Sequence, residues 1–376
     1  MFFDWLSCYQ DFDFELPIIS DNGYAFFDFV EGELGTIKQS KIKFEGSYST
    51  SISVHVQGNR LVVEGNPSRF GRLDNLVGFS SLDDCFKVYN SILTGLGLPV
   101  FTKCTKLGYI DYLNGKAPRV VVDGAILTRL DLTENQFVGG GVCISTYLKA
   151  LSMLPFRRSR ANLYPDGNTV DWKSIQGNAT YLYPSVYNKA VELKLHLLPK
   201  VKRAFGDASD EYLYVSNLIK YCAENGVTRH EIKIKSAYLI RHNLAFWGLS
   251  KHNQLTDLHN EFINLDQKLK VSAMDLRTIS QTLLEEEICT STKAANTTAL
   301  YAYNWMNGDT FESHKKQVQI HRARLRKIGI DILKPCNLLI FSPVIVKKVT
   351  EIHRSNFVAP DFYKHAALPS HLRLIA

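Results

Sequence analysis

Apolar and polar residues recur along this chain with two different periods, which predict a mixture of strands and helices. The stretch 51–64 alternates on both sides of a Gly-Asn pair and predicts a β-hairpin. The stretch 81–96 repeats apolar residues at helical spacing, with acidic residues in its first turn and glycines at its end, and predicts a helix. Further helices are predicted over 141–154 and over 209–224, the latter ended by an Asn-Gly pair.

Two later stretches should carry charges on one strand face, because successive side chains of a strand point to opposite faces. The region 120–133 should place Ile126, Thr128, Leu130 and Leu132 on one face and Leu127, Arg129, Asp131 and Thr133 on the other. The strand 227–235 should place His230, Ile232 and Ile234 on one face and Arg229, Glu231, Lys233 and Lys235 on the other. Charges on such faces need water or partners, so both faces are candidates for a site.

The remaining pattern divides the chain coarsely. Residues 157–177 predict a loop with a small basic run, and the glycines 139–141 predict a turn from strand to helix. The stretch 179–195 reads as a strand that becomes helical from about Ala190. The pattern is helical from about Leu255 onward, so we place a domain boundary between 248 and 272.

These elements predict an α+β fold. We expect a central, mostly antiparallel sheet with helices packed on it, followed by a smaller helical C-terminal region. The expected regions are a β-rich N-terminal part over 1–105, a catalytic sheet over 106–250, and a helical DNA-binding or accessory region over 260–376.

Composition sets the class of protein and of partner. A net charge of +7 suits a partner that carries phosphates, although enzymes of small anionic substrates share this property. The seven cysteines show no CxxC spacing, which argues against a zinc ribbon or a disulfide framework and for a reducing cytosol. We expect no signal peptide and no membrane span, since the most apolar late stretch, 338–346, is interrupted and short.

The charged strand faces fit metal-assisted phosphoryl transfer. Asp131 and Glu231, with Glu192 as a further candidate, could hold Mg²⁺ or Mn²⁺ through oxygen ligands. Tyr187 could act as the nucleophile, with Lys189 favouring its phenolate or protonating a leaving oxygen. The alternatives are a surface ion pair between Arg129 and Asp131, a purely structural Tyr187, and a Glu231 that only neutralises its neighbours.

A basic amphipathic helix is predicted near the C-terminus, over 311–327, with Asp309 or Thr310 as its N-cap. Val318, His321 and Leu325 share its apolar face. Its candidate DNA-binding side chains are Lys315, Lys316, Arg322, Arg324, Arg326 and Lys327. They indicate either phosphate contacts or a solvated helix face. A helix predicted over 292–306 raises a helix-turn-helix alternative, without a turn signature to support it.

Several motifs, in this order, resemble the gene II/X replication-initiator family of filamentous phages. They are Asp4-Trp5-Leu6, Gly65-Asn66-Pro67-Ser68-Arg69-Phe70, the strand from Arg129 to Thr133, Thr169-Val170-Asp171-Trp172, the run from Tyr187 to Leu193, the strand from Arg229 to Lys235, Pro360-Asp361-Phe362-Tyr363, and Leu374-Ile375-Ala376. The resemblance covers nearly the whole chain. One departure is Leu73-Asp74-Asn75, where the family often shows Gly-His-Asn.

The resemblance implies a Mg²⁺-dependent nickase and ligase for rolling-circle replication, acting at a phage origin in the bacterial cytoplasm. It implies that Tyr187 is the nucleophile and Lys189 its helper, with Arg129 in the catalytic set and Asp131, Glu231 and Glu192 at the metal. The implied partners are double-stranded origin DNA, host helicase and host DNA polymerase, and several copies could assemble on the origin.

Several alternatives stay open. One is a plasmid or mobile-element nickase of the relaxase kind, and another is a DNA-binding regulator without catalysis. Tyr181 and Tyr183 are alternative nucleophiles, Asp74 could replace a metal-binding histidine, and Met274 could start a shorter product.

Overall fold

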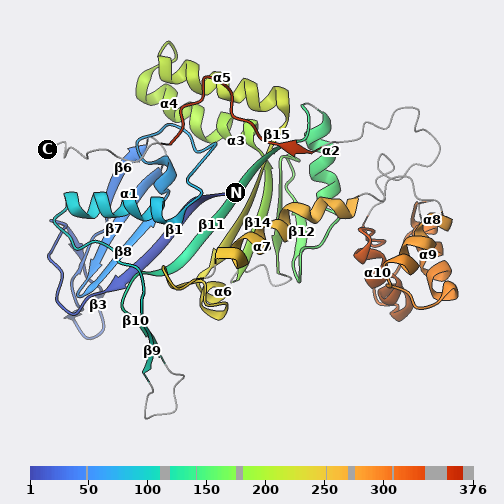
Figure 1. The fold of residues 1–376 in the computed structure, drawn as a ribbon, viewed down its shortest axis with the longest axis horizontal. Helices are drawn as coiled ribbons and strands as arrows, with labels where there is room; N and C mark the ends of the chain where they lie inside the picture. Colours follow the sequence, from blue (N-terminus) through green and yellow to red (C-terminus); the bar gives the residue numbers. More distant parts are fainter. Residues whose placement is uncertain are drawn as a thin grey trace.

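A single large sheet organises the protein, for which the computed structural model describes residues 1–47, 50–110, 119–140, 142–174, 181–250, 252–269, 276–306, 309–334 and 354–366. The ten strands that the structure places in this sheet run in the order β12-β13-β14-β15-β11-β1-β8-β7-β6, with β16 paired to the end of β11 (Figure 1). Every recorded strand pair is antiparallel, and helices pack on the sheet. The predicted α+β class is confirmed.

The strands of the large sheet are β1 (Phe2–Asp11), β6 (Ile42–Ser47), β7 (Thr50–Gln57), β8 (Arg60–Gly65), β11 (Ile126–Phe137), β12 (Arg160–Leu163), β13 (Thr169–Lys173), β14 (Leu182–Asn188), β15 (Val227–Lys235) and β16 (Ser355–Asn356). Small two-stranded ladders join β2 (Gly23–Tyr24) to β5 (Lys38–Gln39), β3 (Phe27–Asp28) to β4 (Glu33–Leu34), and β9 (Leu107–Ile110) to β10 (Arg119–Val122).

The helices are α1 (Leu82–Gly95), α2 (Val142–Leu151), α3 (Lys189–Glu192), α4 (Leu198–Phe205), α5 (Asp210–Asn225), α6 (Ser236–Arg241), α7 (His252–Ile263), α8 (Leu276–Glu285), α9 (Thr292–Met306) and α10 (Lys316–Lys327). A π-helical turn over Leu193–Leu197 connects α3 to α4, and 3₁₀ turns occupy Pro67–Arg69 and Asn264–Leu269. No helix in these described ranges is long and apolar enough to cross a membrane.

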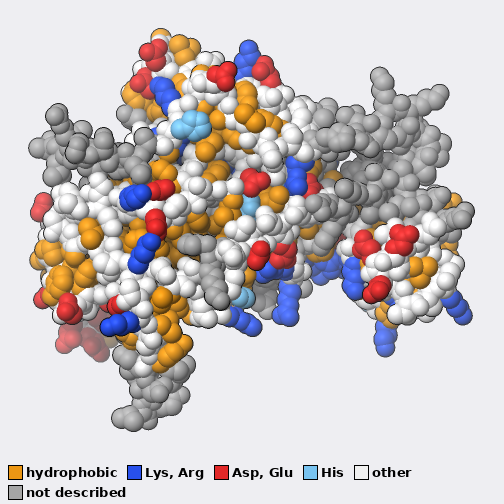
Figure 2. All heavy atoms as spheres, viewed as in Figure 1, with side chains coloured by type: hydrophobic (Ala, Val, Ile, Leu, Met, Phe, Trp, Pro, Cys, Tyr) orange, Lys and Arg blue, Asp and Glu red, His pale blue; other side chains and the backbone are white. Residues whose placement is uncertain are grey.

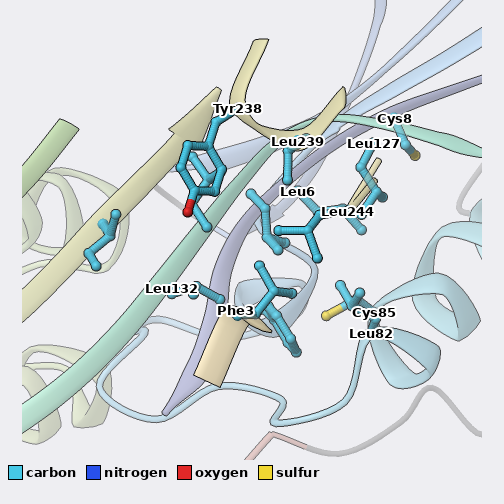
Figure 3. Packing of buried hydrophobic residues seen from close by; sticks show 14 of the residues in the cluster. Phe3, Leu6, Cys8, Leu82, Cys85, Leu127, Leu132, Tyr238, Leu239 and Leu244 are labelled. Carbon is cyan, nitrogen blue, oxygen red and sulfur yellow. The ribbon is translucent and has the colours of Figure 1, made fainter. Parts of the chain in front are cut away.

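The main hydrophobic core lies on one face of the sheet, beneath α1, α2, α6 and α7. Figure 3 shows side chains of β1, β11, α1 and α6 meeting there, among them Leu6, Leu132, Leu82 and Leu239. A second core joins α3, α4 and α5 to Leu76 and Tyr363, and a third joins α8, α9 and α10. The first core leaves the opposite sheet face available for polar side chains.

Serine side chains cap the first two long helices, a signal that the sequence-based predictions did not use. The Ser81 hydroxyl accepts a hydrogen bond from the Asp83 amide at the start of α1, and Ser209 accepts one from Tyr212 at the start of α5. The hairpin β7–β8 turns at Gly58, whose φ of +60° belongs to the left-handed region. These segments confirm the predictions over 51–64, 81–96 and 209–224.

Two predictions about strands were wrong. Within the region 157–177, which was predicted as a loop, residues 160–173 form a hairpin of β12 and β13. The region 120–133 is not one strand, since it divides between β10 and β11.

Leu127 was also assigned to the wrong face. The register between β1 and β11 shifts, so that Ser7 faces Arg129 while Cys8 faces Leu127. This irregularity reverses the alternation, and Leu127 packs in the main core with Leu130 and Leu132.

The basic helix begins later than predicted. It starts at Lys316, after Lys315, which makes no capping hydrogen bond with its side chain, so neither Asp309 nor Thr310 is its N-cap. Its predicted apolar stripe is confirmed, because Val318, His321 and Leu325 are buried. Gly141, Met274, the apolar stretch 338–346 and the C-terminal motif 374–376 lie outside the described residues.

Replacing Gly226 with alanine should destabilise the protein strongly. Gly226 ends α5 with φ +65°, and a Cβ there would lie 1.7 Å from the Gly139 carbonyl oxygen. Gly97 has a similar φ of +68° but nothing within 4 Å of the added Cβ. Gly97→Ala should therefore cost about 1 to 2 kcal/mol, from backbone strain alone. Gly226→Ala should lose roughly 1 to 3 kcal/mol more, from the clash. Urea unfolding of both variants measures the difference, and equal losses would contradict the close packing.

Candidate active site

The three charged motifs lie on adjacent strands, with β15 between β11 and β14. Asp131 of β11 is opposite Lys233 of β15, which is opposite Tyr183 of β14. Arg229 of β15 is likewise opposite Tyr187 of β14. Directly opposite residues share a face, so the motifs meet on the side of the sheet away from the main core, and the prediction of a shared face is confirmed. We call this side the polar face.

Two buried carboxylates form the centre of the polar face. Arg129 donates two hydrogen bonds to Asp131, from Nε at 2.8 Å and from Nη2 at 2.6 Å. Glu231 lies 3.3 Å from the Lys233 ammonium. Burial raises the pKa of Asp131 to about 7, and the negative charge of Glu231 adds to this rise while Arg129 opposes it. The two carboxylates are therefore close enough to repel each other.

Tyr187 touches this carboxylate pair from the end of β14. Its hydroxyl donates a hydrogen bond to Glu231 Oε2 at 3.2 Å, and its side chain is partly buried. Burial raises the pKa of Tyr187 well above its usual value, and the charge of Glu231 raises it further, against the effect of Arg229. The hydroxyl is consequently protonated in the isolated protein at neutral pH.

Lys189 and Glu192 form a neighbouring pair where α3 begins. The fully buried Lys189 ammonium donates to Glu192 Oε2 at 2.6 Å and to Asn75 Oδ1 at 3.0 Å. Burial lowers the pKa of Lys189, and the charge of Arg229 lowers it further. No hydrogen bond joins this ammonium to the Tyr187 hydroxyl among the described residues, so a helper role for Lys189 would act through charge or require movement.

Arg229 connects the strands of the site, a role that the sequence did not reveal. Its Nε donates to Asn135 Oδ1 at 3.0 Å, its Nη2 donates to the Asn75 carbonyl oxygen, and its Nη1 lies 3.7 Å from the Asp4 carboxylate. Asp4 in turn accepts hydrogen bonds from Asn66 at 2.7 Å and from Asn75 at 2.9 Å. The available signal was the position of Asp4 and Arg229 in two of the motifs.

The donor set available to a metal ion is a pair of carboxylates. Within the described ranges, no group of three or more His, Cys, Asp and Glu side chains lies together as a metal site. Asp131 and Glu231 are close enough for their charges to interact, and each is paired with a cation, Arg129 or Lys233, that a divalent ion would have to share or displace. Mg²⁺ commonly takes one or two protein carboxylates and completes its shell with water and substrate phosphate, so these residues fit it.

Comparison with known proteins adds a second line of evidence. Residues 3–257 match the N-terminal part, and residues 283–369 the C-terminal part, of the family described as the replication-associated protein of the gene II type. The replication-associated protein of Escherichia phage If1 is 49% identical over 325 residues, which cover 86% of this chain and 99% of that protein. The chain belongs to the gene II replication-associated protein family.

Membership in this family confirms the predicted resemblance and makes the chain a replication-associated protein of the filamentous-phage type. The charged strands β11, β14 and β15 all fall within the N-terminal match, and the basic helix α10 falls within the C-terminal one. The residue roles assigned above remain predictions.

Asp74, at the point of departure from the family pattern, has a structural environment. It is buried and accepts hydrogen bonds from the Tyr214 hydroxyl at 3.0 Å, the Tyr363 hydroxyl at 2.9 Å and the Leu76 amide at 2.8 Å. These donors give each carboxylate oxygen a hydrogen bond, which favours a structural role over metal binding.

The two alternative tyrosines have different surroundings. The Tyr183 hydroxyl donates to the Asp171 carboxylate at 2.6 Å on the polar face. Tyr181 packs edge-on against the Tyr238 ring at the border of the main core. Of the three tyrosines, Tyr187 is the one whose hydroxyl is hydrogen-bonded to Glu231 in the described part of the chain.

The predicted DNA-binding side chains of the C-terminal helix differ in their surroundings. Lys316 and Lys327 are exposed, and Lys315 is exposed but 2.9 Å from Glu312. Arg322 is paired with Asp331 at 2.6 Å. Arg324 donates to the Thr298 hydroxyl at 3.3 Å, and Arg326 is partly buried. DNA binding by these residues stays a prediction.

Removing the Tyr363 hydroxyl should destabilise the loop that carries Asp74 beside the candidate site. Tyr363→Phe deletes a hydrogen bond to a buried carboxylate and should lower the free energy of unfolding by about 1.5 to 3 kcal/mol. Tyr24→Phe is the control, since Tyr24 is 57% exposed and should change stability by less than about 0.5 kcal/mol. Urea unfolding at neutral pH compares the two variants. Equal free energies of unfolding would show that the hydrogen bond from Tyr363 to Asp74 does not stabilise the protein.

Proposed function

We propose that this chain initiates rolling-circle replication by cutting one strand of the phage origin with Tyr187 and later rejoining it. The observation that carries the proposal is the hydrogen bond of 3.2 Å from the Tyr187 hydroxyl to the buried Glu231, beside Asp131. Membership in the gene II replication-associated protein family supports a role in replication, and the residues around Tyr187 suit the chemistry.

The chemistry is a transfer of one phosphodiester bond. The Tyr187 oxygen attacks the scissile phosphorus, the bond from phosphorus to the 3′ oxygen breaks, and a 5′-phosphotyrosine link and a free 3′-hydroxyl result. The phenol proton passes to Glu231, its hydrogen-bond acceptor, and the departing 3′ oxygen takes a proton from Lys189 or from water. The reverse reaction rejoins a strand without ATP, because the phosphotyrosine link retains the phosphodiester free energy.

The side chains around Tyr187 have distinct parts in this proposal. Asp131 and Glu231 would hold Mg²⁺ or Mn²⁺, with Glu192 as a further candidate, and Arg129 fixes the orientation of Asp131. A bound divalent cation would neutralise charge on the phosphate and favour the phenolate. Arg229 lies beside Tyr187, and its charge lowers the pKa of that hydroxyl.

Replacing Tyr187 with phenylalanine tests the nucleophile. With supercoiled plasmid bearing the candidate origin and Mg²⁺, the wild type should nick and form a covalent adduct. Tyr187→Phe should still bind but lose at least about a thousandfold in nicking and form no adduct. Tyr183→Phe is the matched control and should retain the adduct.

Two outcomes would overturn parts of the proposal. Nicking by Tyr187→Phe at the wild-type rate would transfer the role to another tyrosine. Origin binding by the wild type without nicking, in either Mg²⁺ or Mn²⁺, would favour a DNA-binding regulator.

The metal requirement should depend on pH. Because the pKa of Asp131 is raised to about 7, protons compete with the cation below that pH. The apparent affinity for Mn²⁺, measured by water-proton relaxation, should fall about tenfold per pH unit below 7 and change little above 8. Asp131→Asn should bind Mn²⁺ weakly and lose this dependence. A wild-type affinity that is constant from pH 6 to 8 would exclude Asp131 as a ligand.

A further inference from the structure

A row of side chains crosses the polar face from the candidate site to the edge of the sheet. Asp131 is opposite Lys233, Lys233 is opposite Tyr183, and Lys173 of β13 is opposite Arg160 of the edge strand β12. The Lys173 ammonium lies 5.7 Å from the centre of the Tyr183 ring, and the Lys233 ammonium lies 5.6 Å from it. We call Lys233, Tyr183, Lys173 and Arg160 the cross-strand row.

The cross-strand row is accessible to solvent and is long enough to contact several nucleotides. The side chains of Lys173 and Lys233 are 38% and 29% exposed, and Arg160 is exposed. Neighbouring strands are about 4.8 Å apart, so the three steps from β15 to β12 cover roughly 14 Å. The row therefore presents alternating cations and an aromatic ring over the width of several nucleotides.

A second basic group continues the row beyond the sheet edge. It consists of Arg322 and Arg326, one turn apart on α10, and Lys334, which follows that helix; we call these three residues the basic seam. The positive charge of Arg160 acts on both Arg326 and Lys334, so the seam adjoins the end of the row. In the view of Figure 2, Lys and Arg side chains gather between the main body and the C-terminal helices.

Contacts between the two parts of the protein hold the seam in place. The Lys334 ammonium donates to the Ser152 carbonyl oxygen just after α2, and the Lys334 carbonyl oxygen accepts a hydrogen bond of 2.6 Å from the Trp305 indole. Met153 packs in the C-terminal core. The seam is thus built on rigid contacts rather than on free surface side chains.

The seam, taken together with the neighbouring Arg160, carries more positive charge than Asp331 neutralises. Arg160, Arg322, Arg326 and Lys334 give four positive charges against the one carboxylate of Asp331, a balance of +3, and Arg322 occupies both oxygens of that carboxylate at 2.6 and 2.7 Å. The Arg326 Nε is buried without a hydrogen-bond partner in the described part of the chain. Burial lowers the pKa of Arg326 and of Lys334, and the neighbouring cations lower both further. Such a group favours an anion.

We propose that the cross-strand row and the basic seam bind the phosphates of single-stranded DNA, leading the strand from Tyr187 to the C-terminal helices. Cations that alternate with an aromatic ring are the usual means of holding an unpaired strand, because the bases stack while the backbone is neutralised. The proposal rests on the proposed function, since it assigns the path of the strand that Tyr187 cuts.

The test measures the binding of a fluorescent oligo(dT) of about 20 nucleotides over a series of salt concentrations. All variants carry Tyr187→Phe, so that no cleavage interferes. Arg160→Gln and Arg326→Gln should each weaken binding several-fold and reduce the slope of log affinity against log salt by about 0.7. Arg203→Gln is the matched control, because Arg203 is exposed on α4, away from the row, and should leave affinity and slope unchanged.

Further controls test whether a variant is still folded and whether other ligands bind at the same residues. Lys173 is paired with the buried Asp171, so Lys173→Gln is included only where thermal unfolding shows an intact fold. Inorganic phosphate is added as a competitor, and duplex DNA of the same length is titrated in parallel.

Three results would overturn the inference. Salt slopes in Arg160→Gln and Arg326→Gln that equal the slope of the Tyr187→Phe parent would show that the cross-strand row and the basic seam do not bind the phosphates. Loss of duplex binding with intact oligo(dT) binding would assign the residues to double-stranded DNA. A phosphate-dependent rise in melting temperature that Arg326→Gln abolishes, without any change in oligo(dT) binding, would make the seam a free-anion site. Failure of Tyr187 as nucleophile would leave these binding results intact, so the two proposals fail separately.

Discussion

The fully buried guanidinium of Arg229 is the group on which the polar face depends. A charge without access to water needs partners, and Arg229 finds them on three different parts of the chain. Asn135 belongs to β11, Asp4 belongs to β1, and the Asn75 carbonyl belongs to the loop that follows β8. One cation on β15 therefore fixes the positions of two other strands and of the segment between the 3₁₀ turn Pro67–Arg69 and α1.

The charges of the site fall into two groups with Tyr187 between them. Arg129, Asp131, Glu231 and Lys233 form one group, and Asp4, Arg229, Lys189 and Glu192 form the other. Burial, Glu231 and Glu192 raise the pKa of Tyr187, while Arg229 opposes them. The balance leaves a neutral hydroxyl in the free protein, so its reactivity would depend on what binds beside it. Under the proposed function, a Tyr187 hydroxyl that is inert without substrate would protect against cleavage at other DNA sites.

The sequence predicts the charged strands well because alternation is a local property. Once β11 and β15 are recognised, antiparallel pairing places Asp131 and Glu231 on one face, as the structure has them. The same reasoning failed at Leu127, since an irregularity in the register reverses the alternation and depends on the partner strand. It also missed β12 and β13, two short strands joined by a turn in which Pro165, Asp166 and Gly167 signal a loop.

The supporting residues of the site could not be predicted for a different reason. Asn75 and Asp4 act through contacts with residues far away in the chain, such as the pair formed by Asn75 and Lys189. Nothing in the local pattern distinguishes an asparagine that orients a buried lysine from one in an ordinary turn. The basic helix shows the same limit, because its charge is evident from sequence while the pairing of Arg322 with Asp331 is not.

The hydrogen bond from Tyr363 to Asp74 has a consequence for how the protein folds while it is being synthesised. The two residues are 289 positions apart, yet Asp74 precedes Asn75, which holds both Lys189 and Asp4. A nascent chain that has already folded its sheet still lacks one donor to that buried carboxylate. The hydrogen bonds to Asp74 are complete only when Tyr363 has emerged from the ribosome, so a prematurely ended chain would carry β11, β14 and β15 without one of the contacts that support the loop beside them.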